Sequence, residues 1–427
     1  MSSFPPLVLE NGRIIDPVNG VDQIGTLLIA DGLCRTITPG DPLPKGTEHL
    51  DLTGKWIVPG LIDIHVHLRE PGEEYKETIT TGTTAATAGG FTAVACMPNT
   101  RPVLDTESSI SLVVSRAQGA SARVYPVGAI SKGSHGENLA EFAEMKRSGA
   151  VAFTDDGRPV INSQMMRRAM EYAANFDLPI ISHCEEFSLS NNGAMNEGAI
   201  STRLGLRGIP CAAEEIMVYR DLALAKLTGH RIHLAHISTK ESVSLIRRAK
   251  AQGCHVTAET APHYFTLTEE AIGLYDTFAK MNPPLRTQAD VDAIIAGLQD
   301  GAIDAIASDH APHSEMEKEV EFDQAANGII GLETSLPLAL RLVHKGILSV
   351  ERLVELMSVN PAKILGVPGG SLANGMPADV TIIDPEREFT YTKETIVSMS
   401  KNSPFLGWQF KGSAIITIVG GRIMMRK

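Results

Sequence analysis

The amino-acid sequence predicts an α/β protein, a TIM-type (β/α)8 barrel with a small β domain built from both chain ends. Eight strand-like segments alternate with helix-like segments through the middle of the chain, as in a parallel barrel. Both ends instead contain short β segments separated by turns. The length of 427 residues exceeds one ordinary small domain and suits a barrel with a smaller companion.

The predicted barrel spans residues 57–368. A doubly wound open sheet is the structural alternative, but no GxGxxG turn follows the first strand, which disfavours it. Helix-like segments lie between the candidate strands and include 108–118, 165–176, 213–227 and 240–252. The eight candidate strands are 57–67, 91–99, 122–130, 149–156, 178–184, 230–238, 253–260 and 302–309.

The small β domain is predicted to combine residues 1–56 with residues 369–427. In the first part, Asn11-Gly12 and Asp31-Gly32 are typical of hairpin turns. The second part contains β-rich segments that are interrupted by glycine. Two β-rich ends around a different middle indicate one domain assembled from both.

The composition favours a soluble cytoplasmic protein. The net charge is −12, from 38 Lys and Arg against 50 Asp and Glu, which disfavours nucleic acid and acidic membranes as partners. The five cysteines are scattered without a CxxC pair, so no disulfide framework is expected. No signal-peptide pattern opens the sequence, and no apolar run approaches the roughly 20 residues of a membrane helix.

The first candidate barrel strand carries a polar triplet in the segment LIDIHVHL. Asp63, His65 and His67 alternate with apolar residues, so all three are predicted to point into the barrel. Two imidazoles at positions i and i+2 can converge on one metal ion. The structural alternative is a pair of hydrogen-bonded histidines, which the position at the end of an apolar barrel strand, just before Arg69, disfavours.

Further metal-binding residue types stand at the ends of other candidate strands. Alone, each has an ordinary structural interpretation; Asp-Asp-Gly, for example, is usually a solvated turn. Together with His65 and His67 they predict a dinuclear site, and carboxylates with imidazoles suit Zn²⁺. His233 is out of phase with His236 and is expected to face the helices. The residues at these strand ends are Asp155 and Asp156, His183, His236, and Asp309.

Several segments resemble the dihydroorotase family of the amidohydrolase superfamily, in its bacterial class I type. DIHVHLREP (63–71) resembles the first signature of the family, and ASDHAPHSEMEK (307–318) resembles the second, including the spacing from the histidine to the lysine. The resemblance spans about residues 55 to 380. Supporting segments are MPNTRPV (97–103), FTDDG (153–157), HCEE (183–186), HISTKES (236–242), KMNPPLR (280–286) and GIIGLET (328–334).

The resemblance implies two Zn²⁺ ions per subunit. Asp155 competes with Asp156 for the bridging role, and the family pattern favours Asp156. Many amidohydrolases, hydantoinases among them, instead join their metals with a carboxylated lysine, but no lysine lies between Arg147 and Arg158. The implied ligands are His65 and His67 on one ion, His183 and His236 on the other, Asp156 as the bridge, and Asp309 as the remaining ligand and catalytic acid/base.

The resemblance also implies how the substrate is bound. Related bacterial enzymes tend to have Pro-Phe-Gly where this chain has Ala326-Asn327-Gly328, so the pocket wall is expected to differ there. The implied contacts are Arg69, Asn99 and His313 to the substrate carboxylate, and Asn282 with the backbone around Asn327 and Gly328 to the ring.

The implied reaction is the reversible hydrolysis of dihydroorotate to N-carbamoyl-aspartate in pyrimidine synthesis. A hydantoinase or allantoinase is the alternative in the same class, but a plain hydantoin has no carboxylate for the implied contacts. An inactive dihydroorotase-like scaffold for aspartate transcarbamoylase is the alternative in another class. Such relatives tend to lose metal ligands, and all six are present here. A homo-oligomer is expected, with aspartate transcarbamoylase as a candidate partner.

Overall fold

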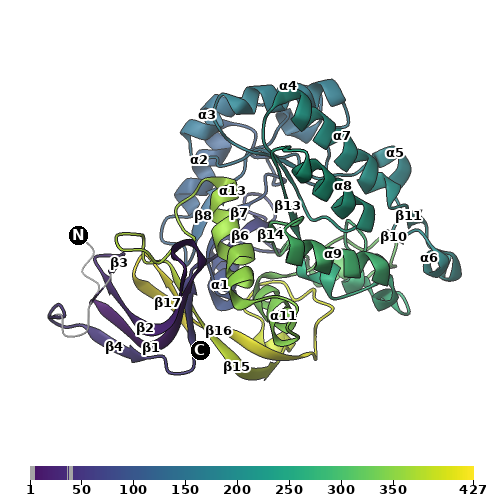
Figure 1. Ribbon diagram of the computed structural model, residues 1–427. Helices are drawn as coiled ribbons and strands as arrows, with labels where there is room; N and C mark the ends of the chain where they lie inside the picture. The colour runs from purple at the N-terminus through teal and green to yellow at the C-terminus, as the bar shows by residue number, and fades with distance from the viewer. Residues whose placement is uncertain (1–4, 36, 38–41) are drawn as a thin grey trace.

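The computed structural model describes residues 5–35, 37 and 42–427, so residues 1–4, 36 and 38–41 of the predicted end domain lie outside the described residues. The chain forms a barrel surrounded by helices and a separate sheet to which both chain ends contribute (Figure 1). In this end sheet, purple strands from the start of the chain lie beside yellow strands from its end.

The prediction that both ends build one β domain is confirmed. The sheet order is β17-β16-β15-β5-β1-β2-β3, with β4 paired to β1, and the antiparallel pair β5–β15 joins the two ends of the chain. Apolar residues of these strands, such as Leu9 and Ile382, form a core of their own. The strands are β1 (Leu7–Asp16), β2 (Val21–Ala30), β3 (Leu33–Arg35), β4 (Glu48–Asp51), β5 (Trp56–Pro59), β15 (Val380–Thr390), β16 (Gln409–Val419) and β17 (Arg422–Arg426).

The barrel contains all eight predicted strand positions. In the fourth, 149–156, Phe153 forms parallel bridges to Gly128 and Ile180, which join β8 to β9. The barrel closes where His310, just after β14, pairs with Val66 of β6. The barrel strands are β6 (Leu61–Val66), β7 (Phe91–Cys96), β8 (Arg123–Pro126), β9 (Ile180–Ser182), β12 (Ile232–Leu234), β13 (Val256–Thr260) and β14 (Ala305–Ile306).

Helices cover the outside of the barrel, as the alternating pattern predicts (Figure 1). A two-stranded ribbon, β10 (Met195–Asn196) with β11 (Gly208–Ile209), follows the fifth strand. Within the described part of the chain, no helix combines the length and apolar character needed to cross a membrane. The helices are α1 (Ile79–Gly89), α2 (Glu107–Arg116), α3 (Phe142–Arg147), α4 (Ser163–Ala174), α5 (Phe187–Ser190), α6 (Ala199–Leu204), α7 (Ala212–Thr228), α8 (Lys240–Ala251), α9 (Gln288–Asp300), α10 (Glu315–Lys318), α11 (Leu332–His344), α12 (Val350–Val354) and α13 (Asn360–Leu365).

The predicted strand 57–67 is in fact two strands. Trp56–Pro59 pairs with β15 in the end sheet, whereas Leu61–Val66 pairs with β7 in the barrel. The chain passes between the two sheets at Gly60, where a Cβ atom would lie 2.2 Å from the Oγ1 atom of Thr92. Only glycine fits this close crossing.

The strict alternation predicted for the segment LIDIHVHL is wrong. Ile62 and Ile64 belong to the apolar cluster inside the barrel, not to the cluster that includes Val66 and faces the helices. The register of β6 against β7 shifts between Asp63 and Val66, so the faces of the strand exchange within the segment. Asp63 takes no place among the site residues, because its carboxylate accepts hydrogen bonds from the backbone N–H groups of His65 and Ser308.

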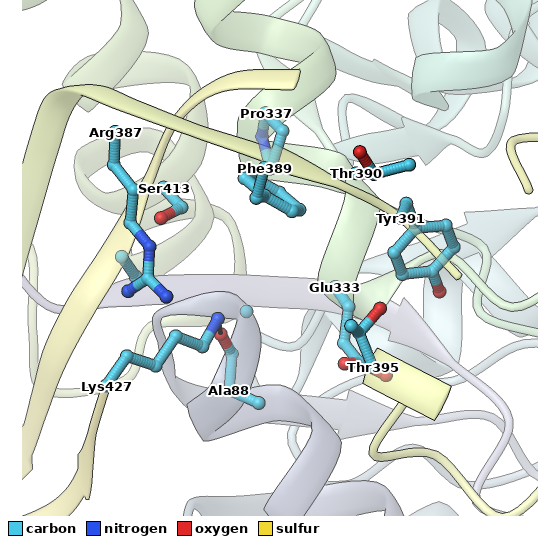
Figure 2. A pocket seen from close by; sticks show the side chains of 12 residues that line it. Ala88, Glu333, Pro337, Arg387, Phe389, Thr390, Tyr391, Thr395, Ser413 and Lys427 are labelled. Carbon is cyan, nitrogen blue, oxygen red and sulfur yellow. Dashed lines mark hydrogen bonds between the residues drawn. The ribbon is translucent and has the colours of Figure 1, made fainter. Parts of the chain in front are cut away.

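A pocket of about 300 Å³ lies between the barrel helices α1 and α11 and the end sheet (Figure 2). The carboxylate of Glu333 in α11 accepts hydrogen bonds from the backbone N–H groups of Val397 and Ser398. The Lys427 ammonium, at the end of the sheet, donates to the Ala88 carbonyl in α1. These contacts fasten the end sheet to the barrel, and among the described residues none of the predicted site residues lines this pocket.

Candidate metal centre

The residues predicted to bind metals come together at the carboxyl end of the barrel. Asp156 lies at their middle, with its Oδ1 atom 3.4 Å from His65 Nε2, 3.6 Å from His236 Nε2 and 3.7 Å from His183 Nδ1. Its Oδ2 atom lies 3.7 Å from His67 Nε2. Two groups of three potential ligands result, and both contain Asp156.

Asp309 lies at the edge of this cluster. Its Oδ1 atom is 3.1 Å from His67 Nε2 and 3.7 Å from His65 Nε2. It faces the same cavity as Asp156 and His183. Its carboxylate is therefore close to the metal ligands and also open to a bound molecule.

Asp155 points elsewhere. Its carboxylate accepts hydrogen bonds from the backbone N–H groups of Ile130, at 2.8 Å, and Ser131, at 3.0 Å, and from the Ser131 hydroxyl. Burial raises the pKa of this carboxyl group to about 6 against the opposing effect of these hydrogen bonds. Asp155 therefore anchors the loop after β8, and of the two aspartates only Asp156 belongs to the cluster.

Three histidines have their ring orientation set by a partner behind them. The Nδ1 atom of His65 lies 2.6 Å from Glu259, the Nδ1 atom of His67 lies 2.9 Å from Asn99 Oδ1, and the Nε2 atom of His183 lies 2.9 Å from Glu185. Each of these nitrogens is therefore assigned as an N–H donor to an oxygen. In the neutral form that binds a metal, the second nitrogen of each ring carries a lone pair toward the centre.

The donor set fits divalent metal ions. Among the described residues the buried His65 Nε2 atom has no hydrogen-bond partner, and the His183 Nδ1 and His236 Nε2 atoms lie only 2.8 Å apart. Four imidazoles and two carboxylates that converge in a buried site are the ligand types of zinc and similar ions. Leaving such groups buried without a cation would be costly.

The charge balance of the centre keeps its carboxyl groups ionised. Burial opposes ionisation of Asp156, but the neighbouring histidines, His65 first, hold its pKa well below the usual range. Burial also opposes ionisation of Asp309, yet the neighbouring histidines lower its pKa to about 2. Ionised carboxylates are the form in which aspartate binds a metal.

Three non-glycine residues at the site have left-handed backbone conformations. The φ angles are 34° at His236, 48° at Asp309 and 61° at Arg69, and each residue follows a barrel strand. Such conformations are sparsely populated by L-residues and are concentrated at functional sites. Here they break the strand alternation at the point where the side chains must turn toward the cavity.

Sequence analysis missed Glu259, and it placed His233 wrongly. His233 does not face the helices; its ring lies between Thr257 Oγ1, at 2.8 Å, and Glu259 Oε2, at 3.1 Å. Glu259 is fully buried and bonds His65 through its other oxygen. One carboxylate on β13 therefore orients a candidate ligand on β6 and a supporting histidine on β12. A buried Glu within an apolar strand was the available sequence signal.

Replacing Glu259 with glutamine should weaken metal binding by about 10- to 100-fold, the usual cost of losing a group that orients a ligand. Glu259 contacts His65 through Oε1 and His233 through Oε2, so glutamine would place an NH2 donor against one of the two rings. Titration of the metal-free variant with Zn²⁺ measures the change. The matched control is Glu77→Gln, because Glu77 is also buried and lies 3.5 Å from a histidine, His310, that is no candidate ligand. Equal affinities in wild type and Glu259→Gln would contradict the role.

The predicted substrate contacts line one cavity of about 210 Å³ together with the metal-site residues other than His65. Some of them are held by other groups of the chain. The Asn99 amide donates to Asp156 Oδ2 at 3.2 Å, the Asn282 amide donates to Glu185 at 2.9 Å, and His313 Nε2 lies 2.8 Å from the Asn327 carbonyl oxygen. Glu185, which also bonds His183, thus connects the metal centre to the predicted ring contact.

Arg69 and Gly328 make different contributions to the cavity. The Arg69 side chain is 8% exposed, donates from Nε to the Pro312 carbonyl, and has no carboxylate in ion-pair contact among the described residues. Gly328 uses its N–H on the Lys280 carbonyl, and its own carbonyl accepts from Lys318. Its φ angle is 114°, and a Cβ atom would lie 2.5 Å from that of Ala311. Arg69 therefore presents to the cavity a cation that lacks a carboxylate partner among the described residues. Gly328 mainly keeps the cavity open, because it has no side chain.

The fold is shared with solved hydantoinases and dihydropyrimidinases. The L-hydantoinase (dihydropyrimidinase) from Arthrobacter aurescens matches with a TM-score of 0.89 and 26% identity, over 99% of this chain and 96% of that one. Dihydropyrimidinase from Brevibacillus agri, at 23% identity, has the same fold with a TM-score of 0.87 over 99% of this chain and 95% of that one. The barrel, the end sheet and the buried His and Asp cluster define a cyclic amide hydrolase of the amidohydrolase class.

Sequence comparison narrows the class to a family. A family model described as "Dihydro-orotase-like" matches residues 54–242. The dihydroorotase of Desulfotalea psychrophila is 59% identical over 415 residues, which cover 97% of this chain and 98% of the relative. The dihydroorotase of Desulforapulum autotrophicum is 57% identical over 422 residues, with 98% of each chain covered. The chain belongs to the dihydroorotase family.

Proposed function

We propose that the protein catalyses the reversible hydrolysis of the cyclic amide of (S)-dihydroorotate to N-carbamoyl-L-aspartate, in the ring-closing direction of de novo pyrimidine (UMP) biosynthesis. The observation that carries this proposal is Arg69, a buried guanidinium without a carboxylate partner among the described residues, beside the His and Asp cluster. A planar guanidinium matches a carboxylate through two parallel hydrogen bonds. The substrate would supply the missing carboxylate.

The residues that would hold two Zn²⁺ ions are those of the candidate centre, in the bacterial class I arrangement. Bound divalent cations supply Lewis acidity, which lowers the pKa of water and polarises an amide carbonyl. Support comes from the shared position of Asp156 in both ligand groups. The assigned ligands are His65 and His67 for one ion, His183 and His236 for the other, Asp156 for both, and Asp309 beside the first.

Asp309 would move the proton. An amide nitrogen is a poor leaving group unless it is protonated as the bond breaks, so the reaction needs a general acid/base beside the carbonyl. Asp309 lies in the cavity wall between the metal ligands and the substrate side. Its carboxylate takes the proton of the attacking water and delivers it to the departing nitrogen. In ring closure the same group transfers the proton in reverse.

Arg69, Asn99 and His313 would bind the substrate carboxylate. Arg69 supplies charge and Asn99 a neutral donor. The single N–H of the neutral His313 ring would pass from the Asn327 carbonyl to the substrate carboxylate. Burial and the charge of Arg69 lower the pKa of His313 to about 3, so its ring is neutral near pH 7. Asn282 and the Asn327-Gly328 backbone would face the ring.

Removing the metals should abolish dihydroorotate hydrolysis, and adding Zn²⁺ should restore it. In the proposed mechanism the metals are the Lewis acids that polarise the amide carbonyl and lower the pKa of water. The measurement is turnover of a chelated, metal-analysed sample before and after titration. A panel of dihydroorotate, hydantoin, dihydrouracil and allantoin identifies the substrate. Preference for hydantoin would favour the hydantoinase or allantoinase alternative, and full activity of metal-free protein would refute the metal assignment.

Replacing Arg69 with methionine should weaken dihydroorotate binding far more than binding of an analogue without the carboxylate. Loss of a charged hydrogen-bond partner typically costs about 1.5–3 kcal/mol. Inhibition constants for both ligands measure the difference. The control is Arg220→Met, because Arg220 is also largely buried and donates to a backbone carbonyl, that of Val160, outside the cavity. Equal losses for the two ligands would make Arg69 a structural residue.

We also propose a cytoplasmic homo-oligomer that can associate with aspartate transcarbamoylase. The composition and the cysteine pattern support the compartment. The convergence of all six proposed ligands disfavours an inactive scaffold. Light scattering of the protein alone, and of a mixture with the transcarbamoylase, measures both associations; a monomer in both would contradict the proposal.

A further inference from the structure

Lys318 is a fully buried cation close to the proposed substrate cavity. It ends the short helix α10, and its side chain is 0% exposed. Its partners in the described structure are three backbone carbonyl oxygens, those of Ala326 at 2.7 Å, Gly328 at 3.1 Å and Lys280 at 3.3 Å. An ammonium group has three protons, so each proton has one acceptor.

We propose that Lys318 is a positioning residue for substrate binding, which fixes the segment 326–328 as one wall of the cavity and ties it to the segment that carries Asn282. This inference rests on the proposed function, because that function assigns substrate contacts to both segments. Lys318 itself does not line the cavity. It would act through the backbone that it holds.

The contacts of Lys318 bracket Asn327. The carbonyls on either side of this residue, at Ala326 and Gly328, are both bonded to the same ammonium group. The Asn327 carbonyl meets the His313 ring on the cavity side. The Ala326 carbonyl belongs to the peptide before Asn327 and the Gly328 carbonyl to the peptide after Gly328. Fixing both restricts the backbone torsions of Asn327 and Gly328 together, which sets the position of Asn327 in the wall.

The same ammonium group joins two walls of the cavity. The Lys280 carbonyl accepts from Lys318 and also from the Gly328 N–H at 3.0 Å. Lys280 stands two residues before Asn282, which lines the cavity. Movement of segment 326–328 would therefore move segment 280–282 as well.

The chemistry of this site calls for a cation that donates three hydrogen bonds. Backbone carbonyls are present whatever side chains occupy positions 326 and 327, so the contact tolerates the Ala-Asn pair found here. A buried ammonium is costly unless it is fully bonded. Burial with the nearby Lys280 charge lowers the pKa of Lys318 to about 7, and the three carbonyl acceptors favour its protonated form. An apolar residue would avoid that cost, so packing alone gives no reason for a lysine.

A residue from the C-terminal part of the chain also holds the wall formed by segment 326–328. Asn402 donates from Nδ2 to the Gly328 carbonyl at 3.1 Å and to the Ala311 carbonyl at 3.0 Å, and its Oδ1 accepts from the His313 N–H. Because Asn402 remains, loss of Lys318 should loosen the wall without unfolding it. The Ala326 carbonyl would lose its contact with Lys318, whereas the Lys280 carbonyl would keep the Gly328 N–H.

The test compares Lys318→Met with the control Lys250→Met, each as the full metal-loaded chain. Lys250 also donates to a backbone carbonyl, that of Gly301, and pairs with Asp304 before β14, far along the barrel from the cavity. For Lys318→Met we expect faster hydrogen exchange in peptides that cover 324–330, unchanged bound metal, and a KM for dihydroorotate about tenfold higher with a smaller change in kcat. The control should show none of these changes.

Unchanged KM and unchanged exchange in 324–330, with only a lower melting temperature, would overturn the proposal and make Lys318 a packing residue. If Lys318→Met does not fold, Lys318→Gln keeps two donors without the charge and should show smaller changes of the same sign. The exchange measurement needs no turnover. Faster exchange in Lys318→Met, together with a wild type that does not turn over dihydroorotate, would therefore support the role of Lys318 and contradict the proposed function.

Discussion

The Asp309→Asn variant is expected to fold and to lose about 10²- to 10⁴-fold in turnover, the usual contribution of a general acid/base. Asparagine has nearly the same shape but cannot transfer the proton. Among the described residues, the one hydrogen-bond contact of the Asp309 carboxylate is with His67 Nε2, so the surrounding structure should persist. The measurement is kcat for dihydroorotate in both directions, together with bound metal per chain.

Bound metal separates the two contributions of Asp309. Retained metal with lost turnover would assign the loss to proton transfer, and lost metal would assign part of it to ligation. Asp221→Asn is a control, because Asp221 is a fully buried aspartate of helix α7 that accepts a hydrogen bond from Ser182 and pairs with Arg220 outside the cavity. Turnover of Asp309→Asn within twofold of wild type would contradict the assignment.

The Asp156→Ala variant is expected to lose both turnover and most of the bound metal. Asp156 belongs to both groups of potential ligands, so its loss should affect both ions at once. An imidazole that binds a metal brings no negative charge, so removal of the Asp156 carboxylate takes away negative charge at the middle of the cluster. Metal analysis after dialysis against a fixed Zn²⁺ concentration gives the measurement.

Asp155→Ala is the internal control for Asp156→Ala. It removes the acceptor for the backbone N–H groups of Ile130 and Ser131, which should cost about 1–3 kcal/mol of stability but leave the metals bound. A direct carboxylate bridge also predicts activity that does not depend on bicarbonate. The described residues around the cavity include no lysine. A carboxylated lysine between the metals, or metal loss only in Asp155→Ala, would refute the bridge.

The barrel strands and the end domain were predictable because their signals are local. Apolar runs, turn residues and helix periodicity each depend on a few neighbouring positions. The proposed ligands were predictable for a related reason: parallel strands bring their carboxyl ends to one rim, so residue types at successive strand ends are neighbours in space. His183 and His236 are separated by 53 positions in the sequence, yet the Nδ1 atom of His183 lies 2.8 Å from the Nε2 atom of His236.

The predictions of which way a side chain points, made from strict strand alternation, were wrong where the strands are irregular. His233 was expected to face the helices because it is out of phase with His236. The backbone at His236 has a φ angle of 34°, which breaks the strand period between the two residues, and His233 faces Glu259 instead. The register shift after Asp63 has the same effect in β6. Irregularities of this kind depend on pairing with distant strands, which a local pattern does not contain.

The sequence by itself determined the barrel, the shared end domain and the set of residue types at the cavity rim, because these follow from patterns within single segments. Only the tertiary structure decided which groups hold those residues in place. Glu259 behind His65, Glu185 between His183 and Asn282, and Lys318 beneath segment 326–328 each join segments distant in the chain. Their hydrogen bonds form only when the folded barrel brings those segments together, and the buried interior then requires that each polar group find a partner.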